Sequence, residues 1–227
     1  MSVLNDPTLE RLLDRLHAQS DAQAAAMQAE QKTRAGELSD DPVERAAQVK
    51  TWLADKMVAL DRDKAEFCYQ LCRAMGARRI VEIGTSFGVS TLYLAAAARD
   101  NVRASGGEGL VFATEYEPRK AAIARGHWRE AGLGDYVDLL EGDLRETLRT
   151  LEGPIDFMLV DIWIPMARPA LDLVAPLLRP GAVVICDNTS AYRDAYADYL
   201  AVINDPANGF RTTTLPFDGG LEMSVRG

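Results

Sequence analysis

The segment from Arg79 to Leu94 constrains the fold of this chain more than any other. It opens with the apolar run Ile80–Ile83, passes through Gly84 and Gly88, and then shows helical spacing. A continuous apolar run bounded by glycine is typical of a buried parallel strand. The glycines allow a tight turn and a close approach of the backbone to a ligand. The segment therefore predicts a strand, a glycine turn and a helix with free N–H groups at its start.

Glu82 and the glycine spacing distinguish two cofactor classes. Dinucleotide folds use Gly-x-Gly-x-x-Gly to seat a pyrophosphate, whereas three residues separate Gly84 from Gly88 here. The Glu82 carboxylate would repel a pyrophosphate but suits the amino group of an amino acid. This indicates S-adenosylmethionine, and the segment Val81–Gly88 resembles the first motif of the class I methyltransferases. The alternative is an ordinary strand–helix turn whose glycines serve only the bend.

The composition is that of a soluble globular protein with one large α/β domain. The chain has 227 residues, a hydrophobic content of 48% and a net charge of −9. This charge argues against nucleic acid or an anionic membrane as a partner. We expect a cytoplasmic protein, because the sequence shows neither a signal-peptide core nor an apolar run of membrane length. Cys68 and Cys72 are interpreted as buried residues rather than as half of a zinc site.

Polar residues also follow the second and third predicted strands, Leu110–Thr114 and Tyr136–Leu140. Glu115 stands at the end of the second strand, where a carboxylate can accept both hydroxyls of a ribose. Tyr116 stands beside it and can stack on adenine. The turn with Asp143 and Leu144 follows the third strand, and we expect it to lie next to the first two turns, where the adenine would sit.

Two further acids stand at the ends of the fourth and fifth predicted strands. Asp161 ends the fourth strand, Phe157–Asp161, and Asp187 with Asn188 follows the fifth strand, Ala182–Cys186. Because ligands bind at the carboxyl edge of open α/β sheets, these side chains are expected to meet there. Two carboxylates and an amide are hard oxygen ligands that suit Mg²⁺. The alternative is that the two acids only cap helices and turns.

The order of elements predicts a doubly wound sheet with helices on both faces. Five alternating strand–helix units are followed by a hairpin. Residues 1–45 are predicted to form a helical extension, and residues 46–227 the methyltransferase-like domain. Gly36 and the cluster Ser39–Pro42 are expected to end the first helix. The extension is interpreted as a lid, as a dimer arm or as a helix packed on its own domain, and we expect a homodimer.

Three local expectations can be checked directly. A second helix is expected over residues 42–60, and another over residues 191–202. Arg179–Gly181 is expected to be a turn before the fifth strand.

The motifs together resemble the cation-dependent O-methyltransferases, the group that contains catechol and caffeoyl-CoA O-methyltransferases. The resemblance covers Ala46 to Arg226 and implies a Rossmann-like, mostly parallel sheet with strand order 3-2-1-4-5-7-6. It rests on the ordered set of Glu82-x-Gly84, Glu115, Asp161, Asp187-Asn188 and Gly219-Gly220-Leu221-Glu222. It implies the following binding residues: Asp161, Asp187 and Asn188 for the divalent ion; Glu82, Gly84 and Ser90 for the methionine part of the cofactor; Glu115 for the ribose; and Tyr116, Asp143, Leu144 and Trp163 around adenine. Ser86 and Gly88 complete the predicted cofactor turn, and Asp161 borders it.

One position departs from the family. Well-known members carry a lysine three residues after the metal-binding acid, which resembles a general base. This chain has Ile164 at that place, and no lysine follows it. We predict a Mg²⁺-dependent transfer of a methyl group from S-adenosylmethionine to a hydroxyl of a small phenolic or catechol-like acceptor, with Asp161, Asp187 and Asn188 as the catalytic residues. The rivals are a metal-independent methyltransferase acting on a carboxylate or amine, and a non-catalytic protein that binds S-adenosylmethionine.

Overall fold

The computed structural model describes residues 3–34, 39 and 41–227. The chain forms two compact units, one over Leu4–Ala59 and one over Leu60–Gly227. Gly36 and Asp40, which were predicted to help end the first helix, lie outside the described residues. The boundary predicted after residue 45 stays a prediction.

The first unit contains two helices, α1 (Pro7–Arg34) and α2 (Pro42–Leu53). The helix predicted over residues 42–60 is therefore wrong beyond Leu53. The following residues bond to α1 instead of continuing their own helix. The amide of Met57 donates to Gln23 Oε1 at 2.9 Å, and the amide of Ala59 donates to Ser20 Oγ at 3.1 Å. These side-chain bonds take the backbone groups that a longer helix would use.

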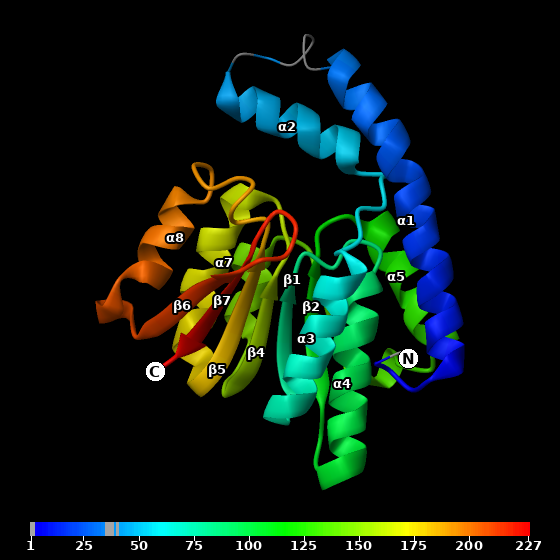
Figure 1. Cartoon of the computed structure of the whole chain (residues 1–227), viewed down its shortest axis with the longest axis vertical. Helices are drawn as coiled ribbons and strands as arrows, with labels where there is room; N and C mark the ends of the chain where they lie inside the picture. The colour runs from blue at the N-terminus through cyan, green and yellow to red at the C-terminus, as the bar shows by residue number, and fades with distance from the viewer. Residues whose placement is uncertain (1–2, 35–38, 40) are drawn as a thin grey trace. The chain divides into compact units, whose positions relative to one another are not determined.

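The second unit is built on a seven-stranded sheet of order β3-β2-β1-β4-β5-β7-β6, which confirms the expected topology (Figure 1). Five strands run parallel, and β7 is antiparallel to both β5 and β6. The strands are β1 (Arg79–Ile83), β2 (Leu110–Glu115), β3 (Val137–Glu141), β4 (Ile155–Val160), β5 (Leu178–Asp187), β6 (Phe210–Leu215) and β7 (Leu221–Arg226).

Helices cover both faces of this sheet, in two sets that pack among themselves. The helices α3, α4 and α5 form one layer, and α6, α7 and α8 form the other (Figure 1). Apolar side chains of β1, β4 and β5 form a buried core with α7 and α8. The helices are α3 (Arg62–Met75), α4 (Val89–Ser105), α5 (Pro118–Glu130), α6 (Leu144–Thr147), α7 (Ala167–Val174) and α8 (Ala197–Asn204), with short 3₁₀ turns at Gly134–Tyr136, Leu148–Thr150, Ile164–Met166, Ala175–Leu177 and Pro206–Asn208.

Two local expectations are corrected by tertiary contacts. Arg179–Gly181 is not a turn but part of β5, because the pairing register between β4 and β5 shifts after Ile155 and accommodates these residues. The helix expected over residues 191–202 begins only at Ala197. Just before it, the amides of Ser190 and Ala191 both donate to the carbonyl of Gly219, at 3.0 and 2.9 Å. These bonds hold the segment against the β6–β7 turn.

The three cysteines are free and buried, which agrees with the interpretation of Cys68 and Cys72 from their spacing. Across the described part of the chain, no helix is both long and apolar enough to cross a bilayer.

Candidate active site

The sheet register aligns the carboxyl ends of four strands. Ile83 of β1 pairs with Thr114 of β2 on one side and with Val160 of β4 on the other, and Val160 pairs with Cys186 of β5. The residues that follow these four positions are Gly84, Glu115, Asp161 and Asp187. They therefore stand in one row, which we call the acidic edge, and this is where open α/β sheets bind ligands.

Gly84 allows β1 and β4 to approach closely at this edge. Its φ is +95°, and a Cβ atom there would lie 2.1 Å from the carbonyl oxygen of Asp161. The same approach lets the amide of Asp161 donate to the Ile83 carbonyl at 3.0 Å. A side chain at residue 84 would push the two strand ends apart, so the glycine is required by packing as well as by the turn.

Glu82 is a fully buried carboxylate surrounded by hydroxyl groups. Thr85 and Thr91 donate to its Oε2 at 2.9 and 2.5 Å, and Ser90 donates to its Oε1 at 2.6 Å. Burial raises the pKa of Glu82, and the three hydroxyls lower it only in part, so it stays above its ordinary value. The hydroxyls fix the direction of the carboxylate beside the glycine turn. Such an arrangement suits a cationic group of a ligand.

Ser86 and Glu115 are connected across the ends of β1 and β2. The Ser86 amide donates to Glu115 Oε2 at 2.7 Å, and the Glu117 amide donates to Oε1 at 2.7 Å. Ser86 has a left-handed backbone, with φ of +51°. Backbone strain of this kind in a non-glycine residue is typical of ligand-binding turns. Burial raises the pKa of Glu115, although the backbone N–H groups partly offset it.

The end of the glycine turn is held by α5. The indole of Trp128 donates to the Gly88 carbonyl at 3.2 Å, and His127 Nδ1 lies 2.9 Å from the Phe87 carbonyl. A Cβ atom on Gly88 would meet the indole nitrogen at 2.6 Å. His127 thus contacts the backbone of the turn.

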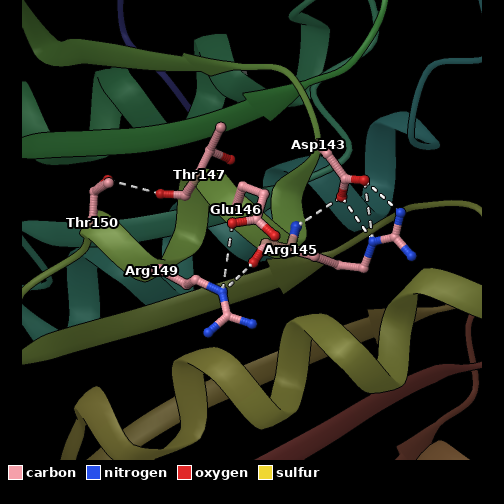
Figure 2. A network of polar contacts seen from close by, with 6 residues as sticks. All are labelled: Asp143, Arg145, Glu146, Thr147, Arg149 and Thr150. Atoms are coloured by element: carbon pink, nitrogen blue, oxygen red, sulfur yellow. Dashed lines mark hydrogen bonds and ion pairs between the residues drawn. The ribbon is translucent and has the colours of Figure 1, made fainter.

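The turn after β3 lies next to Glu115, whose carbonyl accepts the Gly142 amide at 2.9 Å. Asp143 caps the short helix α6 by accepting the Arg145 amide at 2.9 Å. Its carboxylate also accepts the guanidinium of Arg145, with Nε 3.0 Å from Oδ1 (Figure 2). Asp143, which was predicted near adenine, is therefore already engaged. Leu144 is buried in the apolar core, whereas Tyr116 is 56% exposed.

Asp187 and Asn188 lie at the other end of the acidic edge, and a lysine lies with them. Asp187 is 4% exposed, and its Oδ2 accepts the Asn188 side-chain amide at 2.7 Å. Its Oδ1 lies 2.8 Å from the ammonium of Lys64 on α3. Asn188 has a left-handed backbone, with φ of +60°. Asp161 stands in the same row, after β4.

The two carboxylates influence each other. Burial raises the pKa of Asp161, and the charges of Asp187 and Glu82 raise it further, while Lys64 opposes them. Burial also raises the pKa of Asp187, although Lys64 lowers it. A bound cation would relieve this repulsion. The described residues contain no group of three or more histidine, cysteine or acidic side chains arranged to hold a metal. An ion here would need oxygen ligands from outside the protein.

A hollow of about 650 Å³ opens beside Asn188. It lies between the segment after β5 and the β6–β7 turn, and Tyr192, Pro216 and Phe217 contribute apolar surface to it. Gly219 makes this packing possible, because a Cβ atom there would lie 2.4 Å from Asn188 Oδ1. The glycine pair of the hairpin thus brings the turn against the acidic edge.

Trp163 and Ile164 follow Asp161, and the 3₁₀ turn after β4 begins at Ile164. Ile164 is partly buried and packs against the apolar core. The carbonyl of Trp163 accepts the Met166 amide at 2.8 Å, which closes the turn.

Sequence reasoning missed Lys64, Thr85 and Thr91. The two threonines stand close to Glu82 in the chain, and their hydroxyls were the available signal. Lys64 precedes Cys68 by four residues, so it shares the helix face that the cysteines were expected to bury. That spacing could have identified Lys64 as a buried lysine.

The sheet order and the glycine turn define a class I methyltransferase fold. Residues 81–189 match the family model described as a methyltransferase domain. The catechol O-methyltransferase of Mycobacterium tuberculosis is 34% identical over 153 residues, 66% of each chain. That of Niastella koreensis is 28% identical over 135 residues, 58% of each chain. The chain thus aligns with less than two thirds of the length of either relative.

Solved structures show the same fold. The cofactor-bound structure of Rv0187 from MTB is 27% identical, with a TM-score of 0.67, and the match covers 87% of this chain and 95% of that one. The O-methyltransferase from Bacillus cereus in complex with SAH has a TM-score of 0.66 at 24% identity, covering 88% and 97% of the two chains. The chain thus contains a methyltransferase domain and is similar to the catechol O-methyltransferases.

Proposed function

We propose that this protein transfers a methyl group from S-adenosylmethionine to a hydroxyl of a small phenolic or catechol-like acceptor, assisted by Mg²⁺. The acidic edge carries the proposal, because it combines an acid at the end of β2 with two acids and an amide at the ends of β4 and β5. The catechol O-methyltransferase names of the relatives support the acceptor class.

The cofactor is proposed to lie along the ends of β1, β2 and β3. Glu82 is suited to the amino group, because three hydroxyls hold its carboxylate in place. Glu115 is suited to the ribose, because each of its oxygens keeps acceptor capacity beyond its backbone bond. The remaining proposed contacts are Gly84, Ser86, Gly88, Ser90 and Asp161 for the methionine part, and Tyr116, Asp143, Leu144 and Trp163 for adenine.

Asp161, Asp187 and Asn188 are the proposed holders of Mg²⁺. Their donor chemistry fits this ion, which prefers oxygen ligands and takes few of them from the protein while keeping waters or substrate oxygens. When bound, S-adenosylmethionine supplies an electrophilic methyl group and Mg²⁺ supplies a Lewis acid that lowers the pKa of a hydroxyl.

The protein itself contributes orientation. Tyr192, Pro216 and Phe217 line the hollow beside Asn188 and are proposed to bind the acceptor ring. Holding the acceptor in line with the donor can supply several kcal/mol of the barrier. Ile164 offers no proton acceptor, and it packs on the core. The acceptor proton is therefore not taken up at this position.

One observation favours the metal-independent rival. The ammonium of Lys64 already contacts Asp187, at 2.8 Å, so the edge carries a cation of its own. A reaction without Mg²⁺ would use this fixed charge to stabilise the acceptor.

Turnover of catechol by the full chain, with the methylated product measured by mass spectrometry, tests the proposal. We expect product with Mg²⁺ and none after EDTA treatment. Asp161→Asn should abolish turnover. The matched control is Asp172→Asn, which removes an exposed acid on α7 that pairs with Arg168. Full activity of protein shown to be metal-free would favour the metal-independent rival. Binding of S-adenosylhomocysteine without turnover of any hydroxyl acceptor would favour a non-catalytic role.

A further inference from the structure

Lys64 is a buried lysine beside the acidic edge, and the proposed reaction does not use it. It lies in the first turn of α3, and its side chain is 1% exposed. Its ammonium lies 2.8 Å from Asp187 Oδ1 and 2.8 Å from Asp61 Oδ2. The Asp61 side chain, in contrast, is 57% exposed. The lysine is therefore shared between one buried and one exposed carboxylate.

The contacts of Asp187 leave little of its carboxylate free. Oδ1 faces the ammonium of Lys64, and Oδ2 accepts the amide of Asn188. The ammonium of Lys64 thus lies directly beside a proposed metal ligand.

We propose that Lys64 weakens the binding of a divalent cation at Asp161, Asp187 and Asn188, because its ammonium holds one oxygen of Asp187 and adds a positive charge to the site. The inference rests on the metal site of the proposed function. The charge of the lysine offsets part of the negative charge of the two carboxylates that would hold the ion. Lys64 thus acts on the metal through Asp187 and lowers the affinity of the site.

Two substitutions with opposite expected effects test this inference. Lys64→Met removes the charge and keeps a long apolar stem in the buried position. Asp61→Asn removes the second partner of Lys64, which then bonds mainly to Asp187, and it also removes a negative charge. Asp61 is the N-cap residue of α3 but makes no side-chain cap hydrogen bond, so the substitution removes none and the fold should be kept. Asp172→Asn controls for the loss of an exposed acid elsewhere.

The measurement is the dissociation constant of Mn²⁺ for the full chain, from electron paramagnetic resonance at pH 8 without cofactor or acceptor. We expect Lys64→Met to bind Mn²⁺ about tenfold more tightly than the unmodified protein, which corresponds to about 1.4 kcal/mol. We expect Asp61→Asn to bind severalfold more weakly and Asp172→Asn to bind equally well. General damage to the site would weaken binding in both variants and would not reproduce the opposite signs.

Each outcome decides the inference. Unchanged or weaker Mn²⁺ binding in a folded Lys64→Met protein overturns it, as does the absence of binding in both proteins. Binding that appears only in Lys64→Met supports it. If circular dichroism shows that Lys64→Met does not fold, Asp61→Asn decides, and unchanged or tighter binding there overturns the inference. Methyl transfer is measured separately, so failure of this inference is distinguishable from failure of the proposed function.

Discussion

Replacing Glu115 with alanine should weaken cofactor binding by about 1.5–3 kcal/mol, the range for hydrogen bonds to a charged group. The structure shows why this carboxylate can serve a ribose. It accepts the amides of Ser86 and Glu117, both at 2.7 Å, through different oxygens. A carboxylate has about four acceptor positions, so acceptor capacity remains for the ribose beyond these backbone bonds. The predicted loss corresponds to a rise in the dissociation constant of roughly 10- to 150-fold.

Isothermal titration calorimetry with S-adenosylhomocysteine measures this effect without turnover. Glu117→Gln is the matched control, because it removes the same charge two residues away, and its affinity should stay close to that of the unmodified protein. Thermal unfolding without ligand shows whether Glu115→Ala still folds, since the substitution also leaves two backbone N–H groups without their acceptor. A folded Glu115→Ala protein with unchanged affinity would remove Glu115 from the cofactor site.

Three further predictions concern the cofactor site and assembly. Burial raises the pKa of Glu82, so on acidification its carboxylate loses its charge at a higher pH than an ordinary glutamate does. Calorimetry should therefore show the affinity for S-adenosylhomocysteine falling as the pH is lowered toward the pKa of Glu82, while Glu82→Gln binds weakly at every pH. A parallel fall in both proteins would argue against the role of Glu82. The stability of the unliganded protein should depend on pH in the opposite direction. Because the folded protein raises the pKa of Glu82, the contribution of this residue to the free energy of unfolding decreases as the pH rises above the pKa of Glu82 in the unfolded chain. Arg145→Ala should tighten S-adenosylhomocysteine binding by releasing the Asp143 carboxylate, whereas Arg149→Ala, on the following turn, should leave the affinity unchanged (Figure 2). Equal affinities of the two variants and the unmodified protein would exclude competition between Arg145 and the cofactor for Asp143. Light scattering should give twice the chain mass of 24.8 kDa for the full chain. A shift to the mass of one chain after deletion of residues 1–35 would assign the dimer contact to this segment. A monomeric full chain would refute the homodimer.

The main features of the sheet were predictable because each depends on local sequence. The apolar run before Gly84 and the glycine turn after it are contiguous in the chain, and the strand Arg79–Ile83 forms there. The hairpin is equally local, since Gly219 and Gly220 join β6 to β7. The row of Gly84, Glu115, Asp161 and Asp187 was also predictable, because parallel strands bring equivalent ends to the same edge.

The errors arose where distant contacts override local preference. The helix expected from residue 191 starts later because the Gly219 carbonyl takes the amides of Ser190 and Ala191. The second helix ends at Leu53 because Ser20 and Gln23 bind the backbone that follows. Neither contact has a signal in the segment it changes.

The sequence by itself determined the class of fold, the glycine turn and the acids at the strand ends, because these follow from the alternation of strands and helices and from the glycine spacing. The tertiary structure alone decided the partners of those acids. It placed Lys64 of α3 against Asp187 of β5, and the guanidinium of Arg145 against Asp143. No lysine follows Asp161 in the chain, and the lysine that reaches this edge comes from an earlier helix. The physical reason is that burying Asp187 requires a partner of opposite charge, and only the packing of α3 on the folded sheet determines which residue reaches it.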